Sequence, residues 1–496
     1  MRGFVIVLFL LKAVLGRSEN ADEAHPKKSN GVGVNGVNSE LHDEKIDVLL
    51  GAELEIGIGS GEQLTFQSEL NSEPVSKSNR FSEVGAKQAF ESDEKHSPEM
   101  RAALSPQWAF ARHVPVVYTW VNGSLPDYRV QRRTAQVAFD ASLAPEQRAA
   151  TAALDGVQRD RDNGELVWSV RSLQRFAPWW EGDLIIVAPE GHVPNWLNVE
   201  KISNRLFANS KTKVRVVAQE DIIPDKYNPT YNTNAIELYL ERIPGIPDSE
   251  NFLIHMNDDY FFASPIWPWD FFTASKKPWL NFESTQIHGG SVQHEEIKNT
   301  GQTWFSAIFK TNGLLNDTAG IWMNYLRHAP TVLDRRAFLI MRHLYANEIE
   351  ETMKNKFRST TDLVPPLLHH GILLSPKINE MGSGGDAVAT GGVPIPLEKA
   401  NREYKLFQIN DNLESVNAEI SSSLFDDSLW DFEDGIDNFK TKSKFGIKCF
   451  VLNDAYGPDL GQSEYIKAVL WDFFEGNSFK SKYEKEEFEI SFNDVS

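Results

Sequence analysis

The 496-residue sequence has a single cysteine, Cys449, and few basic residues for its length. One cysteine excludes an intrachain disulfide, so stability has to come from a hydrophobic core, which a chain of this length can build. Cys449 lies in the apolar run KCFVLND, which favours a buried structural thiol. The chain has 50 Lys and Arg against 70 Asp and Glu, a net charge of −20. This argues against nucleic acid as a partner, because phosphate backbones are bound by clustered Lys and Arg.

Several catalytic signatures are also missing. The sequence contains no Gly-rich Walker loop, no G-x-S-x-G elbow and no H-E-x-x-H pair. These absences remove the P-loop NTPase, α/β-hydrolase and zincin interpretations. His369-His370 could ligate a metal, but no matching Cys, His or Asp spacing completes a zinc site.

The N-terminus, MRGFVIVLFLLKAVLG, is typical of a secretory signal, with a basic start and an apolar core. The apolar run is shorter than the ~20 residues that span a bilayer, and Lys12 interrupts it. The sequence therefore predicts a signal peptide over 1–16. It also predicts a protein of the secretory pathway, in the Golgi lumen or secreted, without a transmembrane segment.

Composition divides the rest of the chain. Residues 17–105 are rich in Ser, Glu, Asn, Gly and Lys, which predicts a low-complexity, disordered segment. A folded domain is expected over 106–480, with the Gly-rich and then acidic stretch 378–440 as an insertion or loop. Residues 481–496 are predicted to be an acidic, solvated tail.

Apolar runs alternate with amphipathic segments from residue 114 onward. The predicted strands cover 114–121, 183–190, 212–222, 252–262 and 448–457. The predicted helices cover 127–150, 161–178, 233–243 and 463–476, and 310–375 is mainly helical. Because the strands are apolar on both faces, the pattern predicts an α/β fold with a mostly parallel sheet covered by helices.

The run FLIHMNDDYFF at 252–262 is the most informative feature. It is apolar and aromatic except for Asn257, Asp258 and Asp259. Two adjacent carboxylates at the end of a buried strand carry a desolvation cost unless a cation meets them. Oxygen ligands select Mg²⁺ or Mn²⁺, and Mg²⁺ usually binds one or two carboxylates plus substrate phosphates. The run predicts a divalent-metal site for a phosphorylated substrate such as a nucleotide sugar, with a solvated Asn-Asp turn as the alternative.

Polar clusters beside two other elements allow more than one interpretation. Asn122-Gly123 follows the first strand, where a turn can present backbone N–H groups to a phosphate. With Ser124 the same residues form an N-glycosylation sequon, and an ordinary turn is the third possibility. Arg161 could pair with a phosphate at a helix start, while Asp162 could cap that helix.

Later clusters add a candidate base. Asn232 and Asn234 begin another predicted helix, where Asn is usually a cap, although the acidic run nearby makes ligand contact an alternative. His328 is a candidate general base because His titrates near physiological pH, and a capping or packing role is its alternative. The charges that could orient it or bind an anion are Asp334, Arg335, Arg336, Arg358 and Asp362. Asn453-Asp454 repeats the Asn-Asp pattern after the last strand.

These segments together resemble the signature regions of the Stealth family. VPVVYTWVNGS, RDNGELVWSVRSLQRFAPW, VPNWLN, VRVVAQEDI and the YNTNAIELYLERIPG…FLIHMNDDYFF block resemble its first two regions. HAPTVLDRR…FRSTTD resembles the third, and CFVLNDAYG…KAVLWDFFE the fourth. All four occur in order and cover about 114–275, 325–375 and 445–480. The family includes the catalytic subunit of the lysosomal-enzyme N-acetylglucosamine-1-phosphotransferase and microbial capsule sugar-phosphate transferases.

The resemblance implies a nucleotide-sugar glycosyltransferase-like (GT-A-like) core. It implies transfer of a sugar-1-phosphate, such as N-acetylglucosamine-1-phosphate, from a UDP-sugar to a hydroxyl of a glycan or glycoprotein, with release of UMP. Carried over by motif, Asp258 and Asp259 meet a Mg²⁺ or Mn²⁺ ion and the diphosphate, and His328 deprotonates the acceptor. The family motif also places four residues at the donor site: Asn122, Arg161, Asn234 and Asp454.

The polar clusters complete the set of candidates. Asp454 is a further candidate metal ligand, and the other candidate substrate-binding residues are Gly123, Asp162, Asn163, Asn232, Arg336, Arg358 and Asn453. Two alternatives stay open: a metal-dependent glycosyltransferase that releases UDP, and a non-catalytic secreted protein that binds glycans. A homo-oligomer is compatible with the sequence, and Asn316-Asp317-Thr318 is an expected surface glycosylation site in a eukaryotic host.

Overall fold

The computed structural model describes residues 97–143, 162–200, 214–382, 389, 391–410, 412–424, 446–454, 461–478 and 480–489. The predicted signal peptide and most of the predicted low-complexity segment lie outside these residues. Helix α4 (Pro98–Ala103) falls inside that segment, and the Ser97 side chain accepts a hydrogen bond from the Met100 N–H (3.2 Å). Met100 and Ala103 are buried in the core, so the folded chain begins before the predicted boundary at 106.

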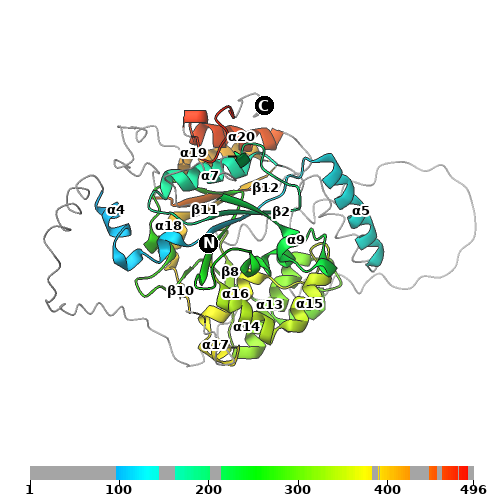
Figure 1. The fold of residues 1–496 in the computed structure, drawn as a ribbon. Coiled ribbons are helices and arrows are strands. Elements are labelled where there is room, and N and C mark those ends of the chain that lie inside the picture. The colour runs from blue at the N-terminus through cyan, green and yellow to red at the C-terminus, as the bar shows by residue number, and fades with distance from the viewer. Residues whose placement is uncertain are drawn as a thin grey trace, which may run out of the picture. The chain divides into compact units, whose positions relative to one another are not determined.

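A five-stranded sheet in the order β3-β2-β1-β4-β9 forms the centre of the fold (Figure 1). The first four strands in that order are parallel: β3 (Val214–Ala218), β2 (Leu184–Ala188), β1 (Val116–Thr119) and β4 (Phe252–Asn257). β9 (Thr331–Asp334) is antiparallel at the edge. The α/β class with a mostly parallel sheet is therefore confirmed. The prediction of helix for 331–334 is wrong. The apolar residues of this segment complete the edge of the sheet, and the next helix begins only after Asp334, which caps it.

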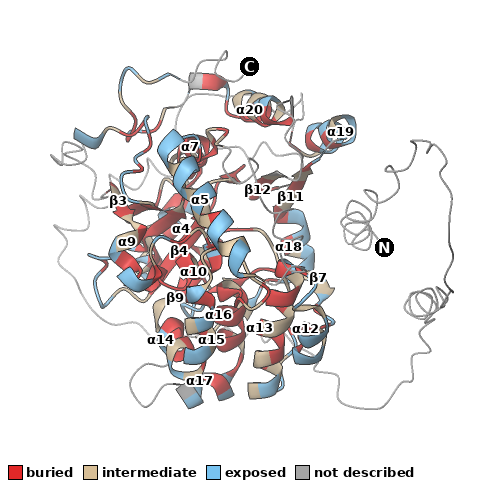
Figure 2. Ribbon diagram, turned by 90° about the vertical axis from the view of Figure 1, so that its right-hand side faces the viewer, coloured by how far each residue is buried: buried red, intermediate tan, exposed pale blue. Residues whose placement is uncertain are grey.

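Both faces of the sheet are buried, as the apolar strands predict. Side chains alternate between two hydrophobic clusters: Val116 and Tyr118 belong to one, and Val117 belongs to the other. Helices α7 (Glu165–Phe176) and α20 (Gly461–Phe473) lie on one side of the sheet in Figure 1. On the other side lie α13 (Thr303–Ala319), α14 (Arg335–Leu344), α15 (Ala346–Lys354), α16 (Pro365–Leu374) and α17 (Pro376–Gly382). Figure 2 shows buried strands between helices whose outer faces are exposed.

A second sheet has the order β11-β12-β5, with β11 (Tyr404–Ile409), β12 (Cys449–Asp454) and β5 (Tyr260–Phe262). The run 252–262 is therefore not one strand: β4 belongs to the central sheet, β5 to the second, and Asp258-Asp259 form the turn between them. The stretch 378–440, predicted as an insertion or loop, supplies β11. Cys449 is buried in β12, which confirms the prediction of a structural thiol.

The remaining elements are shorter or lie at the periphery. The predicted helix 233–243 divides into α10 (Thr233–Glu237) and a 3₁₀ turn, Leu240–Arg242. The other helices are α5 (Pro126–Ser142), α9 (Gln219–Ile222), α11 (Pro268–Phe271), α12 (Ser291–Ile297), α18 (Leu397–Glu403) and α19 (Leu413–Leu424). The other strands are β6 (Trp279–Leu280), β7 (Phe282–Gln286), β8 (Asn324–Leu326) and β10 (Val393–Pro394). Of the helices that the structure describes, none is long and apolar enough to cross a membrane.

The start of the predicted acidic tail is part of the core. Tyr483 and Glu484 are buried, and Glu484 forms an ion pair with the buried Arg171 of α7 (2.7 Å). The Asn198 N–H donates to the Tyr483 carbonyl (2.9 Å), which ties the segment to the loop after β2. The expectation of a solvated tail from 481 is therefore wrong through Glu484, because a buried guanidinium pairs with the Glu484 carboxylate and allows it to be buried.

The paired histidines of α16 have a structural role. His369 and His370 are buried, and their Nδ1 atoms lie 3.3 Å apart. His369 Nε2 accepts the backbone N–H of Asp334 (2.7 Å), which joins α16 to the end of β9. Burial lowers the pKa of His369 to about 3, so the ring stays neutral in the folded protein. Among the described residues, no three His, Cys, Asp or Glu side chains are grouped so as to hold a metal ion.

This neutral ring predicts a loss of stability in acid. Below about pH 6.5 the unfolded chain binds a proton at His369 and the folded chain does not, so the free energy of unfolding falls by up to about 1.4 kcal/mol per pH unit. We expect His369→Gln to be less stable than wild type at pH 7, with a difference that narrows as the pH falls to 5. Urea unfolding at both pH values measures it, with the exposed His343→Gln as control. A difference that stays constant between the two pH values would contradict the assignment.

Candidate active site

The site lies where the strand order of the central sheet reverses direction. From β1 the chain continues to β2 and β3 on one side, whereas β4 pairs with β1 on the other. In open α/β sheets such a switch point, at the carboxyl ends of the strands, is where ligands bind. Thr119 ends β1 and its hydroxyl contacts Asn257 Oδ1 (3.3 Å) and His255 Nε2 (3.1 Å) on β4. Burial lowers the pKa of His255 to about 4, so this ring is neutral.

Asp258 and Asp259 follow β4 directly at this edge, and both are partly buried. After burial itself, the largest effect on the pKa of Tyr260 is the negative charge of Asp259, which raises it further. The Leu452 N–H donates to the Asp259 carbonyl (3.3 Å), and Val451 pairs with Tyr260. Continuing that antiparallel register brings Asn453 opposite Asp258. Asp454 ends β12, and its side chain lies outside the described part of the chain.

A tight turn at the start of α7 adds two more carboxylates. Gly164 has φ +77° and its N–H donates to Asp162 Oδ1 (2.8 Å). The Asn163 backbone and side-chain N–H groups donate to the two Glu165 oxygens (2.8 and 2.6 Å). Burial, then the charge of Asp258 and then that of Asp162 raise the pKa of Glu165 to about 8. Electrostatic coupling thus links this turn to the β4–β5 turn.

Helix α20 closes this side of the site. Ser463 hydrogen bonds to the Asn163 side chain. Burial raises the pKa of Asp162, and the positive charge of Lys467 partly offsets that rise. Region four of the sequence resemblance therefore meets region two at the Asp162-Asn163 turn.

His328 reaches the same edge from the opposite side. β9 runs antiparallel to β4 with Thr331 opposite His255, so His328, three residues before Thr331, is placed beside the end of β4. Burial first, and then the positive charge of Arg358, lowers the pKa of His328. A neutral imidazole is the form that accepts a proton. Arg358 donates two hydrogen bonds to the Thr233 hydroxyl (3.1 and 2.7 Å).

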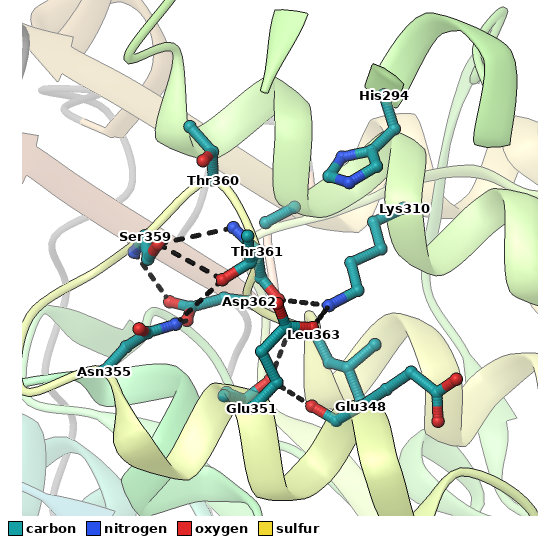
Figure 3. Close-up of polar contacts among 12 residues, drawn as sticks. His294, Lys310, Glu348, Glu351, Asn355, Ser359, Thr360, Thr361, Asp362 and Leu363 are labelled. Carbon is teal, nitrogen blue, oxygen red and sulfur yellow. Dashed lines mark hydrogen bonds and ion pairs between the residues drawn. The ribbon is translucent and has the colours of Figure 1, made fainter. Parts of the chain in front are cut away.

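Two predicted substrate contacts are instead part of a buried network. Asn232 and Asn234 both donate side-chain N–H groups to Asp362 Oδ2 (2.8 and 3.2 Å). Figure 3 shows Asp362 in its loop, where it also accepts from Asn355 (2.8 Å) and from the Ser359 N–H (3.0 Å). Asn232 is fully buried and caps α10. These hydrogen bonds fix the loop that carries Arg358, so both residues support the site, and their direct contact with a ligand stays a prediction.

Arg336 is not at the site. Its guanidinium pairs with Asp334 (2.7 Å), and Asp334 lies opposite Phe252 at the start of β4. The acidic turn follows the other end of β4, about 17 Å away along the strand. The predicted substrate contact is wrong because Arg336 follows an antiparallel strand and so leaves the site edge.

The turn after β1 is present but partly occupied by its own hydrogen bonds. Asn122 Oδ1 accepts from the Ser124 N–H (3.1 Å) and hydroxyl (2.5 Å), and the Asn122 N–H donates to His192 Nδ1 (3.2 Å). The Gly123 carbonyl accepts a hydrogen bond from Arg129 Nε (2.7 Å). Asn122 and Gly123 lie at the site edge, as expected from their place after β1. Arg161 lies outside the described residues.

Comparison with known proteins finds similarity to one family. The model described as Stealth protein CR2, conserved region 2, matches residues 159–280, a segment that runs from the Asp162 turn through the acidic turn. This segment of the chain is thus a Stealth conserved region 2. An exopolysaccharide phosphotransferase of Streptomyces coelicolor is 31% identical to this chain over 261 residues, 52% of this chain and 39% of that one.

Two further relatives carry similar names. The exopolysaccharide phosphotransferase CpsY of Mycobacterium tuberculosis is 28% identical over 308 residues, 60% of this chain and 52% of CpsY. The capsular polysaccharide phosphotransferase LcbA of Aeromonas hydrophila is 28% identical over 262 residues, 53% of this chain and 65% of LcbA. The chain thus spans about half the length of these relatives.

The structure was also aligned with solved structures. The galactosyltransferase LgtC, in complex with donor and acceptor sugar analogues, aligns with 72% of this chain and 96% of its own chain. The TM-score is 0.32 and the identity is 10%.

Two acidic residues near the site are absent from the predicted set. In the sequence, Glu165 is typical of a glutamate in the first turn of a helix, and Glu237 is typical of the polar face of a helix. Burial raises the pKa of Glu237 to about 7, and the charge of Arg358 partly offsets that rise. The negative charge of Glu237 in turn raises the pKa of Tyr260. The sequence does place Glu165 close to Asn163 and Glu237 before the acidic run. Their burial, however, follows only from the three-dimensional structure.

Proposed function

We propose that this protein transfers a sugar-1-phosphate from a UDP-sugar, with N-acetylglucosamine-1-phosphate as the first candidate, to a glycan hydroxyl. The observation that supports it most directly is that the strand registers place Asp258-Asp259 and His328 at the same edge of the sheet, at its switch point. The names of the relatives point the same way, since they are polysaccharide phosphotransferases. The protein would act in the secretory pathway.

In this proposal the acceptor oxygen attacks the phosphorus that bears the sugar. The P–O bond to UMP breaks, UMP leaves, and the proton of the hydroxyl passes to His328. His328 is suited to this because burial and Arg358 lower its pKa and keep it neutral. The bond between the sugar and its phosphate stays intact, so the anomeric configuration is retained.

A Mg²⁺ or Mn²⁺ ion fits the residues at the acidic turn. Mg²⁺ commonly takes one or two carboxylates and completes its coordination with substrate phosphates and water, which agrees with a site that has two adjacent carboxylates rather than a protein cage. Asp258 and Asp259 would hold it, with Asn453 alongside and Asp454 as a further candidate ligand. When bound, it would neutralise charge on the diphosphate.

Product analysis tests the proposal. Purified protein is incubated with UDP-N-acetylglucosamine, Mg²⁺ or Mn²⁺, and mannose-terminated or simple sugar acceptors. We expect UMP release that depends on the metal ion and is lost with EDTA and in Asp258→Asn. EDTA removes the metal ion and the variant lacks one of its proposed ligands, so in both cases the charge of the diphosphate is not neutralised. The exposed Asp248→Asn is the matched control. Release of UDP would indicate transfer of the sugar alone, and no product from any donor would favour a binding protein.

A further inference from the structure

A strip of aromatic side chains lies on α13 and on the segment that follows this helix. Trp322, which follows α13, is 46% exposed. A Cβ added to Gly290 would lie 3.0 Å from the Trp322 ring, so the indole rests directly on the backbone at this glycine. Gly289 in the same way lies under the ring of Phe309, 2.3 Å from where a Cβ would be. Two consecutive glycines thus let two rings lie against one stretch of main chain.

Helix α13 extends this strip. Phe305, Phe309 and Gly313 recur at four-residue spacing, which places them on one face of the helix. The Phe305 and Phe309 rings are 6.2 Å apart, and both are partly exposed. Phe305, Phe309 and Trp322 form what we call the aromatic strip, which follows α13 for about 12 Å. At its rim, the exposed Ser291 hydroxyl donates to Asp317 (2.8 Å).

A row of polar side chains without carboxylates connects the strip to the neighbourhood of the proposed base. Ser284, Gln286 and His288 alternate along β7 and its continuation, and all three are exposed. β7 pairs with β8 in antiparallel register, with Phe282 opposite Leu326. Leu326 comes two residues before His328, whereas His288 directly precedes the glycines under the strip. The row therefore runs about 20 Å from the neighbourhood of His328 to the aromatic strip.

We propose that the polar row and the aromatic strip bind an extended glycan chain, and that the acceptor of this protein is an oligosaccharide or polysaccharide rather than a single sugar. This rests on the proposed function, since it places the acceptor hydroxyl at His328. The negative face of an aromatic ring attracts the C–H groups of a pyranose, and neutral hydroxyl, amide and imidazole groups hydrogen bond to its hydroxyls. An aromatic strip next to polar side chains can therefore contact both the C–H groups and the hydroxyls of a sugar.

Other occupants match the surface less well. A stable protein–protein interface buries about 800 Å² on each partner around an apolar centre, and this surface is a narrow strip followed by polar residues. A membrane surface would attract basic residues beside the aromatic ones. The residues at the rim of the strip are the neutral Ser291 and the acidic Asp317.

Binding of free glycans tests the proposal with a matched control. We expect at least one of mannohexaose, maltohexaose, laminarihexaose and chitohexaose to bind the full-length protein in calorimetry without donor. Trp322→Ala should weaken that binding about tenfold, which corresponds to about 1.4 kcal/mol. Trp304→Ala is the control, because Trp304 is 45% exposed on the same helix but lies outside the strip, and its binding should match wild type.

Kinetics then separate this proposal from the proposed function. With an active acceptor, Trp322→Ala should raise KM for the hexasaccharide about tenfold and leave kcat and the KM for a monosaccharide unchanged. If wild type releases UMP and Trp322→Ala has an unchanged KM for the hexasaccharide, only the proposal of glycan binding at the aromatic strip and polar row would be overturned. Absence of binding to all four hexasaccharides, or equal losses in both tryptophan variants, would also overturn it. Impaired transfer only to intact glycoproteins would show a protein-docking surface instead.

Discussion

Replacing His328 by Ala should reduce kcat about 10²–10⁴-fold, because the variant lacks the group that accepts the proton of the acceptor hydroxyl. Binding of UDP-N-acetylglucosamine should stay within about twofold of wild type, since the variant keeps both carboxylates of the acidic turn. Rates of UMP release, with donor binding measured by calorimetry, give the two quantities. The exposed His343→Ala on α14 is the control and should keep the wild-type rate.

The pH dependence of kcat/KM provides an independent check on His328. Burial and the charge of Arg358 lower the pKa of this ring, so the base stays neutral below the usual histidine range. We expect the acidic limb of the profile below about pH 6.5, the ordinary value for histidine. Arg358→Gln removes the positive charge and should move that limb to higher pH. Retention of full activity in His328→Ala would require another base.

Replacing Glu484 by Gln should cost about 3–5 kcal/mol in the free energy of unfolding. The Arg171 guanidinium is 1% exposed and donates from two nitrogens to the two Glu484 oxygens (2.9 and 2.7 Å), so the variant leaves a buried charge unpaired. Arg171 also lies over the Trp168 ring and donates to the Gly476 carbonyl (3.2 Å). Urea unfolding followed by tryptophan fluorescence measures the loss.

An exposed pair serves as the comparison. Lys480 and Glu489 lie 3.5 Å apart, and Glu489 is 72% exposed, so Glu489→Gln should cost at most about 1 kcal/mol. The double variant Arg171→Met, Glu484→Leu should recover much of the lost stability, because a buried pair can be replaced by apolar groups. Equal stability of Glu484→Gln and Glu489→Gln would show that the segment after 480 contributes little to the fold.

The central fold could be predicted because its two most buried strands are continuous apolar runs. Val116–Thr119 and Leu184–Ala188 are buried on both faces, and this double burial is visible in the sequence as the absence of polar alternation. The turn at Asp258-Asp259 was visible for the same reason, as charge inside an apolar run. β9 was missed because Val332 and Leu333, just before the helix cap Asp334, continue the apolar spacing of the following helix, and only pairing with β4 selects the strand.

The site was predicted in part because its residues follow strand ends, which lie at one edge of a parallel sheet. Roles within the site depend on partners distant in sequence. Asn232 and Asn234 have the chemistry of ligand-binding residues, but Asp362, 130 and 128 positions away, accepts their N–H groups. Arg336 and Arg358 are equally plausible in the sequence, and only the direction of β9 separates them. Glu484 was predicted to lie in a solvated tail because the charge pattern of the sequence does not reveal the Arg171 guanidinium that forms an ion pair with it.

The division of residues 252–262 between two sheets makes the acidic turn a joint. β4 is held in the central sheet and β5 in the second, so the two carboxylates span a seam with no loop to absorb movement. Phe450 of β12 stacks on Phe261 of β5 (5.1 Å between ring centroids) one strand away from the turn. A change in that packing shifts one side of the seam against the other. The orientation of the two carboxylates thus depends on how the two sheets pack within one shared hydrophobic cluster, and residues that never meet a substrate determine it.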